Sequence, residues 1–193
     1  MTPDPITLFA EWFAEASHAG IDKPHAMTLA TAAADGQPSA RTVLLSSFDG
    51  RGFVFHSNYE SRKALEMADN PRVALVFWWD PLGYQVRIEG RVEKTSAAES
   101  DAYFAGRPRG SQLGAWASDQ SRAIERRAVL EERLAARTRE YDGRPVPRPP
   151  HWGGYRVTPQ AIEFWEHRDN RLHQRVRFER DPGGAWRSAL LAP

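Results

Sequence analysis

The segment YFAGRPRGSQLGAWASDQS, residues 103–121, has a composition that favours anion binding. Two arginines, several hydroxyl and amide side chains, three glycines and a proline occur within it. Guanidinium groups bind phosphate with paired hydrogen bonds, and hydroxyl groups can add further donors. These residue types favour a phosphate-binding segment. A solvent-exposed loop after a helix is the alternative that the local composition leaves open.

A second anion site is expected in HSNYESRK, residues 56–63, where a strand runs into a helix. Ser57, Arg62 and Lys63 surround this turn. The free N–H groups and the positive end of the helix dipole attract an anion there. Two neighbouring strands also carry unusual polar residues, because Arg41 opens the apolar run RTVLL and Gln85 interrupts another strand.

A third polar group lies near the C-terminus, in EFWEHRDNRLHQR, residues 163–175. In an extended chain Arg171, His173 and Arg175 point to the same face of a strand. Such a face makes a poor core, so it is expected to meet a ligand or water. An exposed strand face that carries incidental arginines is the other interpretation.

The composition excludes several other classes of function. The chain of 193 residues contains no cysteine, which rules out disulfides and thiolate catalysis and fits a cytoplasmic protein. Its six histidines lack metal-binding spacing, and no nucleotide-binding glycine loop or nucleophile elbow occurs. A net charge of +1 argues against nucleic acid, and no apolar run is long enough to span a membrane. We therefore expect no metal, no nucleic-acid partner and no membrane partner.

The pattern of the chain predicts a single domain over residues 1–193, mainly β with inserted helices (α+β). A packing helix over about residues 5–19 begins with Asp4 and Pro5 and ends at Gly20. Asp-Gly turns between apolar runs indicate hairpins, and meandering strands of this number usually close into a small barrel. The expected strands are 26–34, 39–48, 53–58, 72–79, 84–95, 155–167, 171–180 and 185–193, and the other expected helices are 62–70, 96–104 and 122–140.

Together these motifs resemble the pyridoxine/pyridoxamine 5′-phosphate oxidase family. The resemblance rests on RTVLL, SNYESRKALEMADNPRVAL, QVRIEGRVEK, residues 103–121, PPHWGGYRV, IEFW and RLHQR, in the family's order and spacing. It implies an FMN-binding split β-barrel that works as a homodimer, with FMN at the subunit interface. The implied reaction is the FMN-dependent oxidation of pyridoxine or pyridoxamine 5′-phosphate to pyridoxal 5′-phosphate, with oxygen as acceptor.

The resemblance also implies a role for each unusual residue. Gln120 and Ser121 would reach the FMN from the other subunit. Arg171 and His173 would be catalytic, and His173 would either exchange a proton or orient the substrate ring by a hydrogen bond. The implied cofactor residues are Arg41, Thr42, Val43, Leu44, His56, Ser57, Arg62, Lys63, Gln85, Gln120, Ser121, Trp165 and Arg175. The implied substrate residues are Ser46, Tyr103, Arg107, Ser111, Arg171 and His173.

The sequence departs from the family at three points. Ser46 replaces a lysine that helps bind the substrate phosphate, and His56 replaces an aromatic residue of the flavin strand. The family's basic N-terminal extension is expected to be absent.

These departures leave two alternatives open. The related flavin oxidases of phenazine biosynthesis also lack the lysine at the position of Ser46, but their substrate has no phosphate to occupy Tyr103, Arg107 and Ser111. The other alternative is a non-catalytic protein that binds flavin or pyridoxal phosphate. An RNA-binding barrel is disfavoured by the low net charge.

Overall fold

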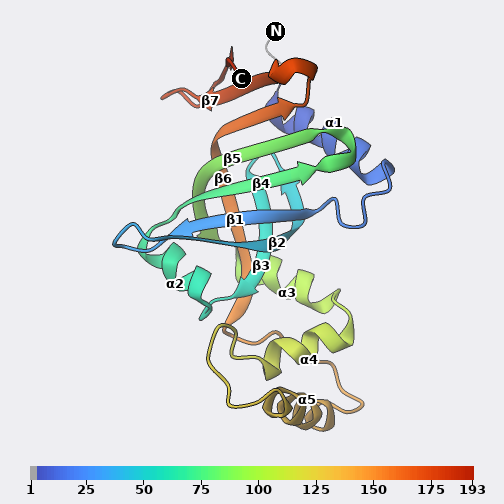
Figure 1. The fold of residues 1–193 in the computed structure, drawn as a ribbon. Coiled ribbons are helices and arrows are strands. Elements are labelled where there is room, and N and C mark those ends of the chain that lie inside the picture. The colour runs from blue at the N-terminus through green and yellow to red at the C-terminus, as the bar shows by residue number, and fades with distance from the viewer. Residues whose placement is uncertain (1–3) are drawn as a thin grey trace.

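The structure, a computed structural model, describes residues 4–193, and its centre is a closed antiparallel β-barrel (Figure 1). The eight strands of this region form one sheet in the order β3-β2-β1-β4-β5-β6-β7-β8. Strand β3 also pairs with β6, which closes the first six strands of that order into a barrel. The predicted small barrel of mainly β structure is confirmed, and β7 and β8 extend from β6 outside it.

The strand boundaries follow the predicted pattern closely. Asp-Gly turns join β1 to β2 and β2 to β3, as the sequence indicates. The barrel strands are β1 Ala26–Ala32, β2 Pro38–Asp49, β3 Gly52–Asn58, β4 Arg72–Trp79, β5 Tyr84–Lys94 and β6 Trp152–Glu166. The outer strands are β7 Gln174–Arg180 and β8 Trp186–Leu190.

One predicted strand begins later than expected. Residues 171–173 were assigned to a strand, but the structure places Asp169–Arg171 in a short 3-10 turn. Asn170 and Arg171 have φ angles of 55° and 61°, in the left-handed region that an extended strand does not contain. The alternation that would align Arg171, His173 and Arg175 on one strand face therefore does not apply to Arg171.

Five α-helices lie around the barrel within the described residues. Asp4 caps the first by accepting a hydrogen bond from the Thr7 backbone N–H at 3.0 Å, as predicted. The helix α5 begins six residues later than the predicted 122. The helices are α1 Pro5–His18, α2 Arg62–Asp69, α3 Ala97–Ala105, α4 Arg109–Ala117 and α5 Ala128–Glu140.

Helix α4 was not predicted, because Gly110 and Gly114 lower the helix propensity of its sequence. Tertiary packing overrides that preference. Leu113 of α4 joins a small apolar cluster with Phe104, Val146 and Trp152. The segment from residue 103 to 121 is therefore mostly helical, and it presents polar side chains from a fixed scaffold.

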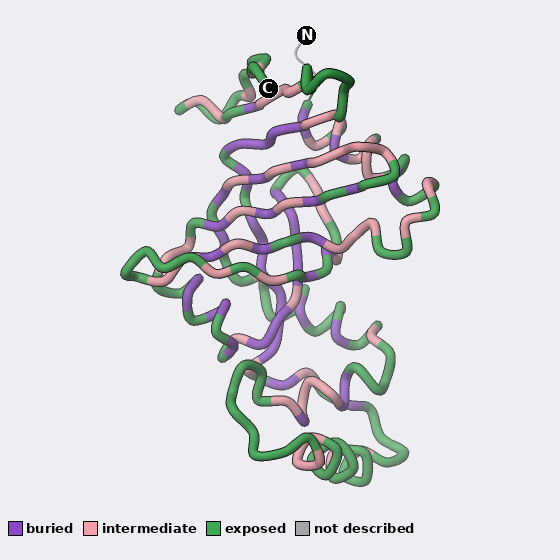
Figure 2. Tube along the Cα trace, in the orientation of Figure 1, coloured by how far each residue is buried: buried purple, intermediate pink, exposed green. Residues whose placement is uncertain are grey.

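The main core fills the barrel and the space beneath α1 (Figure 2). Phe9 of α1 is fully buried, and its ring meets those of Phe48, Phe53 and Phe77 at centroid distances of 4.9 to 5.1 Å. Their interplanar angles of 61° to 84° give the edge-to-face arrangement that aromatic rings prefer. Helix α1 thus plugs one end of the barrel through this residue.

We predict that Phe9→Ala lowers the free energy of unfolding by about 3–5 kcal/mol, the usual cost of deleting a buried phenylalanine ring. Urea denaturation followed by tryptophan fluorescence measures this loss. The control is Glu11→Ala on the exposed side of the same helix, which should change stability by less than about 0.5 kcal/mol. Equal effects of the two substitutions would contradict the role given to Phe9.

Candidate functional site

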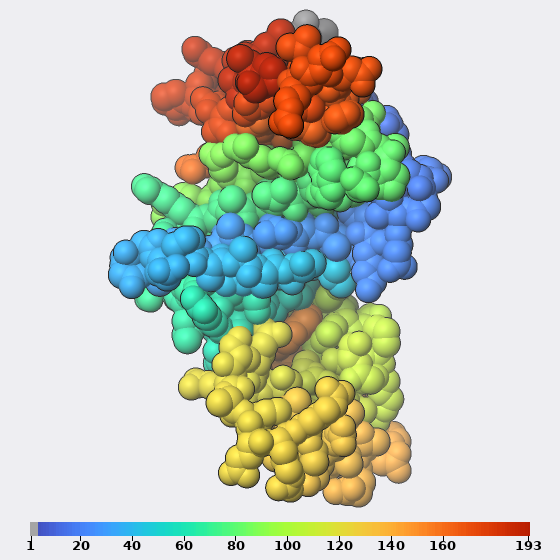
Figure 3. All heavy atoms as spheres, in the orientation of Figure 1, coloured from blue at the N-terminus to red at the C-terminus, as the bar shows by residue number. Residues whose placement is uncertain are grey.

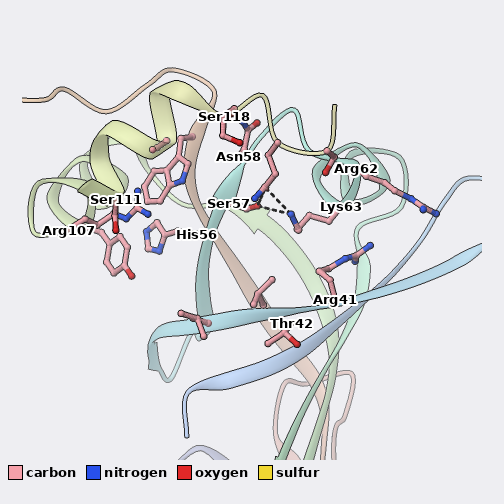
Figure 4. Close-up of a pocket in the computed structure, with 18 of the residues that line it drawn as sticks. Arg41, Thr42, His56, Ser57, Asn58, Arg62, Lys63, Arg107, Ser111 and Ser118 are labelled. Carbon is pink, nitrogen blue, oxygen red and sulfur yellow. Dashed lines mark hydrogen bonds between the residues drawn. The ribbon is translucent and has the colours of Figure 1, made fainter. Parts of the chain in front are cut away.

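A cavity of about 830 Å³ lies between strands β2 and β3, helix α2 and the α3–α4 segment (Figure 4). Its size suits a small-molecule ligand, for which pockets usually measure about 300–1,000 Å³. Four cationic side chains line it, from Arg41, Arg62, Lys63 and Arg107, and no carboxylate does so within the described residues. The helical segment α3–α5 lies against this end of the barrel (Figure 3). The cavity is therefore built for a ligand with more than one negative charge.

Lys63 is the centre of the hydrogen-bond network at one end of the cavity. The residue is only 9% exposed, and its ammonium group donates to Ser57 Oγ at 3.2 Å, Ser61 Oγ at 3.3 Å and Gln120 Oε1 at 3.0 Å. Burial and then the nearby charge of Arg41 lower the pKa of Lys63. Because its three acceptors are neutral, an anion would compensate this buried charge well.

Glu66 fixes the two arginines beside Lys63. Its buried carboxylate accepts hydrogen bonds from Arg41 Nη2 at 3.1 Å and Arg62 Nε at 2.8 Å, and from the hydroxyls of Thr31 and Ser39. Burial alone would raise the pKa of Glu66, but these hydrogen bonds outweigh it and lower the pKa to about 2. Glu66 therefore stays ionised and orients the arginines of β2 and α2.

The other end of the cavity holds Arg107 within an aromatic group. The Arg107 guanidinium lies 4.5 Å from the centroid of the Trp152 ring, and its Nη1 atom is buried without a hydrogen-bond partner. The His56 ring stacks on Tyr103 at 3.7 Å, with an interplanar angle of 6°. A buried guanidinium nitrogen without a partner is costly, so this end also calls for an anion.

The predicted residues thus divide into two groups, and most of them line the cavity. Thirteen of the predicted side chains come together here, and the hydroxyl of Ser111 lies close to Arg107 (Figure 4). They are Arg41, Thr42, Val43, Leu44, His56, Ser57, Arg62, Lys63, Tyr103, Arg107, Ser111, Gln120 and Ser121.

The structure places Gln120 and Ser121 beside Lys63 of the same chain. Gln120 accepts hydrogen bonds from Lys63 and Ser57, and Ser121 lines the same cavity. That both reach a flavin from the partner subunit stays a prediction. The turn after α4 brings them back toward the start of α2, which the sequence order does not reveal.

The remaining predicted residues do not line this cavity. Ser46 uses its hydroxyl to donate to the Val54 carbonyl at 2.9 Å, within the β2–β3 ladder. The others lie around β5, β6 and β7, at the far end of the barrel from α4 (Figure 1). They are Gln85, Trp165, Arg171, His173 and Arg175.

These distant residues form a row of their own. The strand register aligns Gln85 with Trp165 and Trp165 with Arg175, so the three share one side of the sheet. His173 lies 4.4 Å from Trp165 between ring centroids. Arg175 is held by the buried carboxylate of Glu163, with Nε to Oε1 at 2.9 Å. We call Gln85, Trp165, His173 and Arg175 the β5–β7 row.

His173 has a defined hydrogen-bond partner on its Nδ1 atom. The backbone N–H of Arg168 donates to that nitrogen at 3.2 Å. A neutral ring in this position must therefore carry its proton on Nε2. That tautomer makes Nε2 a hydrogen-bond donor to whatever lies beyond it.

Sequence reasoning missed Glu66, its partners Thr31 and Ser39, and Trp152. A signal existed for the first, because Arg62 and Glu66 are four residues apart on one helix. Thr31 and Ser39 are cross-strand partners whose meeting with Glu66 depends on the tertiary fold. Within the described residues no group of three or more potential metal ligands occurs, and no helix is long and apolar enough to cross a membrane.

The closed barrel with its flanking helices and charged cavity defines a split-barrel protein. A family model described as "Pyridoxamine 5′-phosphate oxidase" matches residues 13–139, which is more than half of the chain. A second model, described as "Pyridoxine 5′-phosphate oxidase C-terminal dimerisation region", matches residues 152–193. The chain belongs to the pyridoxamine 5′-phosphate oxidase family.

Similar curated proteins cover the chain almost completely. The pyridoxine/pyridoxamine 5′-phosphate oxidase of Rubrobacter xylanophilus is 61% identical over 99% of this chain and 88% of its own length. The protein of the same name from Cupriavidus necator is 57% identical over 100% of this chain and 91% of its own length.

Two solved structures share the fold. PhzG from Burkholderia lata, solved in complex with tetrahydrophenazine-1-carboxylic acid, has a TM-score of 0.94 and 35% identity over 100% of this chain and 94% of its own. A pyridoxamine 5′-phosphate oxidase-related, FMN-binding protein from Nostoc punctiforme has a TM-score of 0.79 at 18% identity, with full coverage of both chains. The second likeness shows the fold alone.

We predict that Glu66 makes the free energy of unfolding depend on pH in the acidic range. Because the pKa of Glu66 is lowered to about 2 in the folded state, its contribution is fully present above its unfolded pKa of about 4.5. The contribution is lost as the pH falls from there toward 2. Glu66→Gln should therefore lower stability at neutral pH and flatten this part of the stability curve.

Denaturation midpoints measured between about pH 2 and pH 7 check this expectation. The control is Glu93→Gln, since Glu93 is exposed and has no role in the cavity. Glu93→Gln should leave the curve of the wild type intact. An unchanged curve for Glu66→Gln would show that the carboxylate does not hold the two arginines as described.

Proposed function

We propose that this protein is an FMN-dependent oxidase that converts pyridoxine or pyridoxamine 5′-phosphate to pyridoxal 5′-phosphate, with oxygen as electron acceptor. The observation that carries the proposal is a single cavity with a separate cationic group at each end and no carboxylate in its lining. One group suits the phosphate of the cofactor and the other suits the phosphate of the substrate. The names of the relatives with 61% and 57% identity support this reading.

The Lys63 end fits the phosphate of FMN. Lys63, Arg62 and Arg41 supply positive charge, Ser57 and Gln120 supply polar contacts, and the start of α2 adds its dipole. The strand segment from Arg41 to Leu44 lines the cavity beside them, where it would run along the flavin. FMN held there would supply the hydride-accepting chemistry of the reaction, with oxygen as the final electron acceptor.

The Arg107 end fits the phosphate of the substrate. Tyr103 and Ser111 offer hydroxyl groups beside the guanidinium, whose Nη1 atom has no partner in the protein. A phosphate held there would fix one end of the substrate. Anchoring of this kind lets the protein set the distance and angle of the reacting carbon, which is its main contribution in a cofactor enzyme.

The β5–β7 row and Arg171 would complete the site from a second copy of the chain. In one chain this row lies at the opposite end of the barrel from the cavity, so both groups meet only if two copies associate. A two-fold dimer would create two identical sites from the same contacts. The match of residues 152–193 to a dimerisation region supports this arrangement, because that segment includes most of the row.

Within that row, His173 would orient the substrate and Arg175 would face the cofactor. The Arg168 N–H donates to the His173 Nδ1 atom, so the Nε2–H of the neutral ring would be available to donate a hydrogen bond to the substrate. Glu163 holds Arg175 by a buried ion pair and fixes the direction of its guanidinium. Gln85 and Trp165 would contact the flavin ring from the same side.

A phenazine-type oxidase is the second candidate, because PhzG from Burkholderia lata shares the whole fold. Ser46 also fits that alternative. The substrate end argues against it, since Tyr103, Arg107 and Ser111 form a phosphate site that a phenazine precursor would leave without a ligand. Turnover of pyridoxamine 5′-phosphate by the FMN-loaded protein, with hydrogen peroxide as the measured product, decides between the two.

We predict that Arg107→Ala raises the KM for pyridoxine 5′-phosphate by about ten- to a hundredfold. This is the range that the loss of a hydrogen bond to a charged group produces. The matched control is Arg109→Ala, because Arg109 donates to the carbonyls of Tyr141 and Arg144 and does not line the cavity. FMN content should stay unchanged in both variants. A normal KM in Arg107→Ala would move the phenazine-type alternative ahead.

We predict that Arg107→Ala and Arg171→Ala complement each other when they are produced together. Each variant alone should be impaired, since each removes a substrate contact from both sites of the dimer. In a mixed dimer one site receives both defects and the other receives neither, so about a quarter of the wild-type activity should return. Activity assays on co-expressed and separately purified variants measure this. No recovery would mean that each site lies within one chain.

A further inference from the structure

His56 holds a polar atom in the substrate end of the cavity without a partner. The residue lies in β3 immediately before Ser57, so it stands between the Lys63 group and Arg107. Its Nδ1 atom is buried and makes no hydrogen bond in the protein. Two buried nitrogens of cavity-lining residues, His56 Nδ1 and Arg107 Nη1, therefore lack hydrogen-bond partners within the protein. Buried polar atoms without partners are rare in proteins and call for an explanation.

The ring of His56 has little freedom to turn toward another partner. It stacks on Tyr103 at 3.7 Å and on Trp152 at 5.2 Å, with interplanar angles of 6° and 15°. On the β6 side the ring abuts the chain, since a Cβ atom on Gly154 would lie 3.0 Å from His56 Nε2. The stack therefore holds the imidazole in one plane.

The charges that face His56 are positive. Arg107 follows α3, Lys63 of α2 reaches the neighbouring Ser57, and Tyr103 of α3, Ser111 of α4 and Trp152 of β6 are neutral. Burial and then the charge of Arg107 lower the pKa of His56 to about 4. The imidazole is therefore neutral at physiological pH as long as no anion lies beside it.

We propose that His56 is a ligand of the substrate phosphate and takes up a proton when that phosphate binds. The inference rests on the proposed function, because it needs a phosphate at the Arg107 end. A bound phosphate would neutralise the charge of Arg107 and place a negative group next to the ring, and both changes favour the imidazolium. The charged ring then donates from Nδ1 to a phosphate oxygen. His56 thus contacts the substrate phosphate, in addition to lying in the strand beside the flavin.

The test uses FMN-loaded protein and 4-deoxypyridoxine 5′-phosphate, which has no group to be oxidised. Calorimetry in two buffers of different ionisation enthalpy gives the number of protons taken up on binding. The phosphate titrates too, near pH 6, so the wild type is compared with His56→Phe, which keeps the aromatic stack. At about pH 6 the wild type should take up more protons than the variant. Between about pH 8 and pH 6, the affinity of the wild type for this ligand should rise roughly tenfold more than the affinity of the variant does.

A second measurement does not depend on a variant. In protein labelled at histidine, the ring signals of His56 should move to the imidazolium position when the ligand is added at about pH 6. Dephosphorylated 4-deoxypyridoxine should produce no such change. Tight binding of the phosphate with a neutral His56, and equal proton uptake in His56→Phe, would overturn this inference and leave the proposed function intact. If phosphate gives no gain in affinity in either protein, the substrate-phosphate site itself is wrong.

Discussion

The pairing of β3 with β6 is the contact on which both the barrel and its cavity depend. It closes the sheet, and its register places His56 opposite Gly154 and Asn58 opposite Trp152. The two glycines of β6 leave room here for neighbouring side chains. A Cβ atom on Gly153 would lie 2.0 Å from the Tyr59 hydroxyl, and one on Gly154 would lie 2.4 Å from Thr95 Oγ1. The same close approach lets Trp152 reach the aromatic group around Arg107. The pairing that closes the barrel therefore also shapes the Arg107 end of the cavity.

The distribution of carboxylates decides which cations remain available to a ligand. Glu66 is buried beside the cavity and holds Arg41 and Arg62, but it lies outside the lining. Lys63 and Arg107 have only neutral partners or none. Buried charges without counterions cost free energy, and a bound anion recovers it. This arrangement favours ligands that together carry two phosphate groups over uncharged ring compounds.

The sequence predicted the elements better than their relative positions. Strand alternation and Asp-Gly turns placed every barrel strand to within a few residues, because these signals are local. Helix α4 was not predicted because Gly110 and Gly114 lower the helix propensity of its sequence, and tertiary packing stabilises the helix despite them. The late start of β7 depends on the left-handed φ angles of Asn170 and Arg171; asparagine tolerates this region, but the residue type of Arg171 does not indicate it. The contact of Gln120 with Lys63 of the same chain could not be inferred from the sequence, since it depends on which end of the barrel α4 covers.

The cavity residues and the β5–β7 row lie at opposite ends of the barrel within one chain, so the geometry of the proposed site depends on how two chains associate. The cavity residues are fixed by the barrel and by Glu66, and the β5–β7 row is fixed by its strand register and by Glu163. Each group is held by contacts within one chain, so in the proposed dimer the interface sets the distance between them. Reacting groups must be positioned to within a fraction of an ångström for efficient chemistry. Substitutions in the outer strand β8, which supplies no residue of either group, are therefore expected to alter turnover by shifting one half of the site against the other.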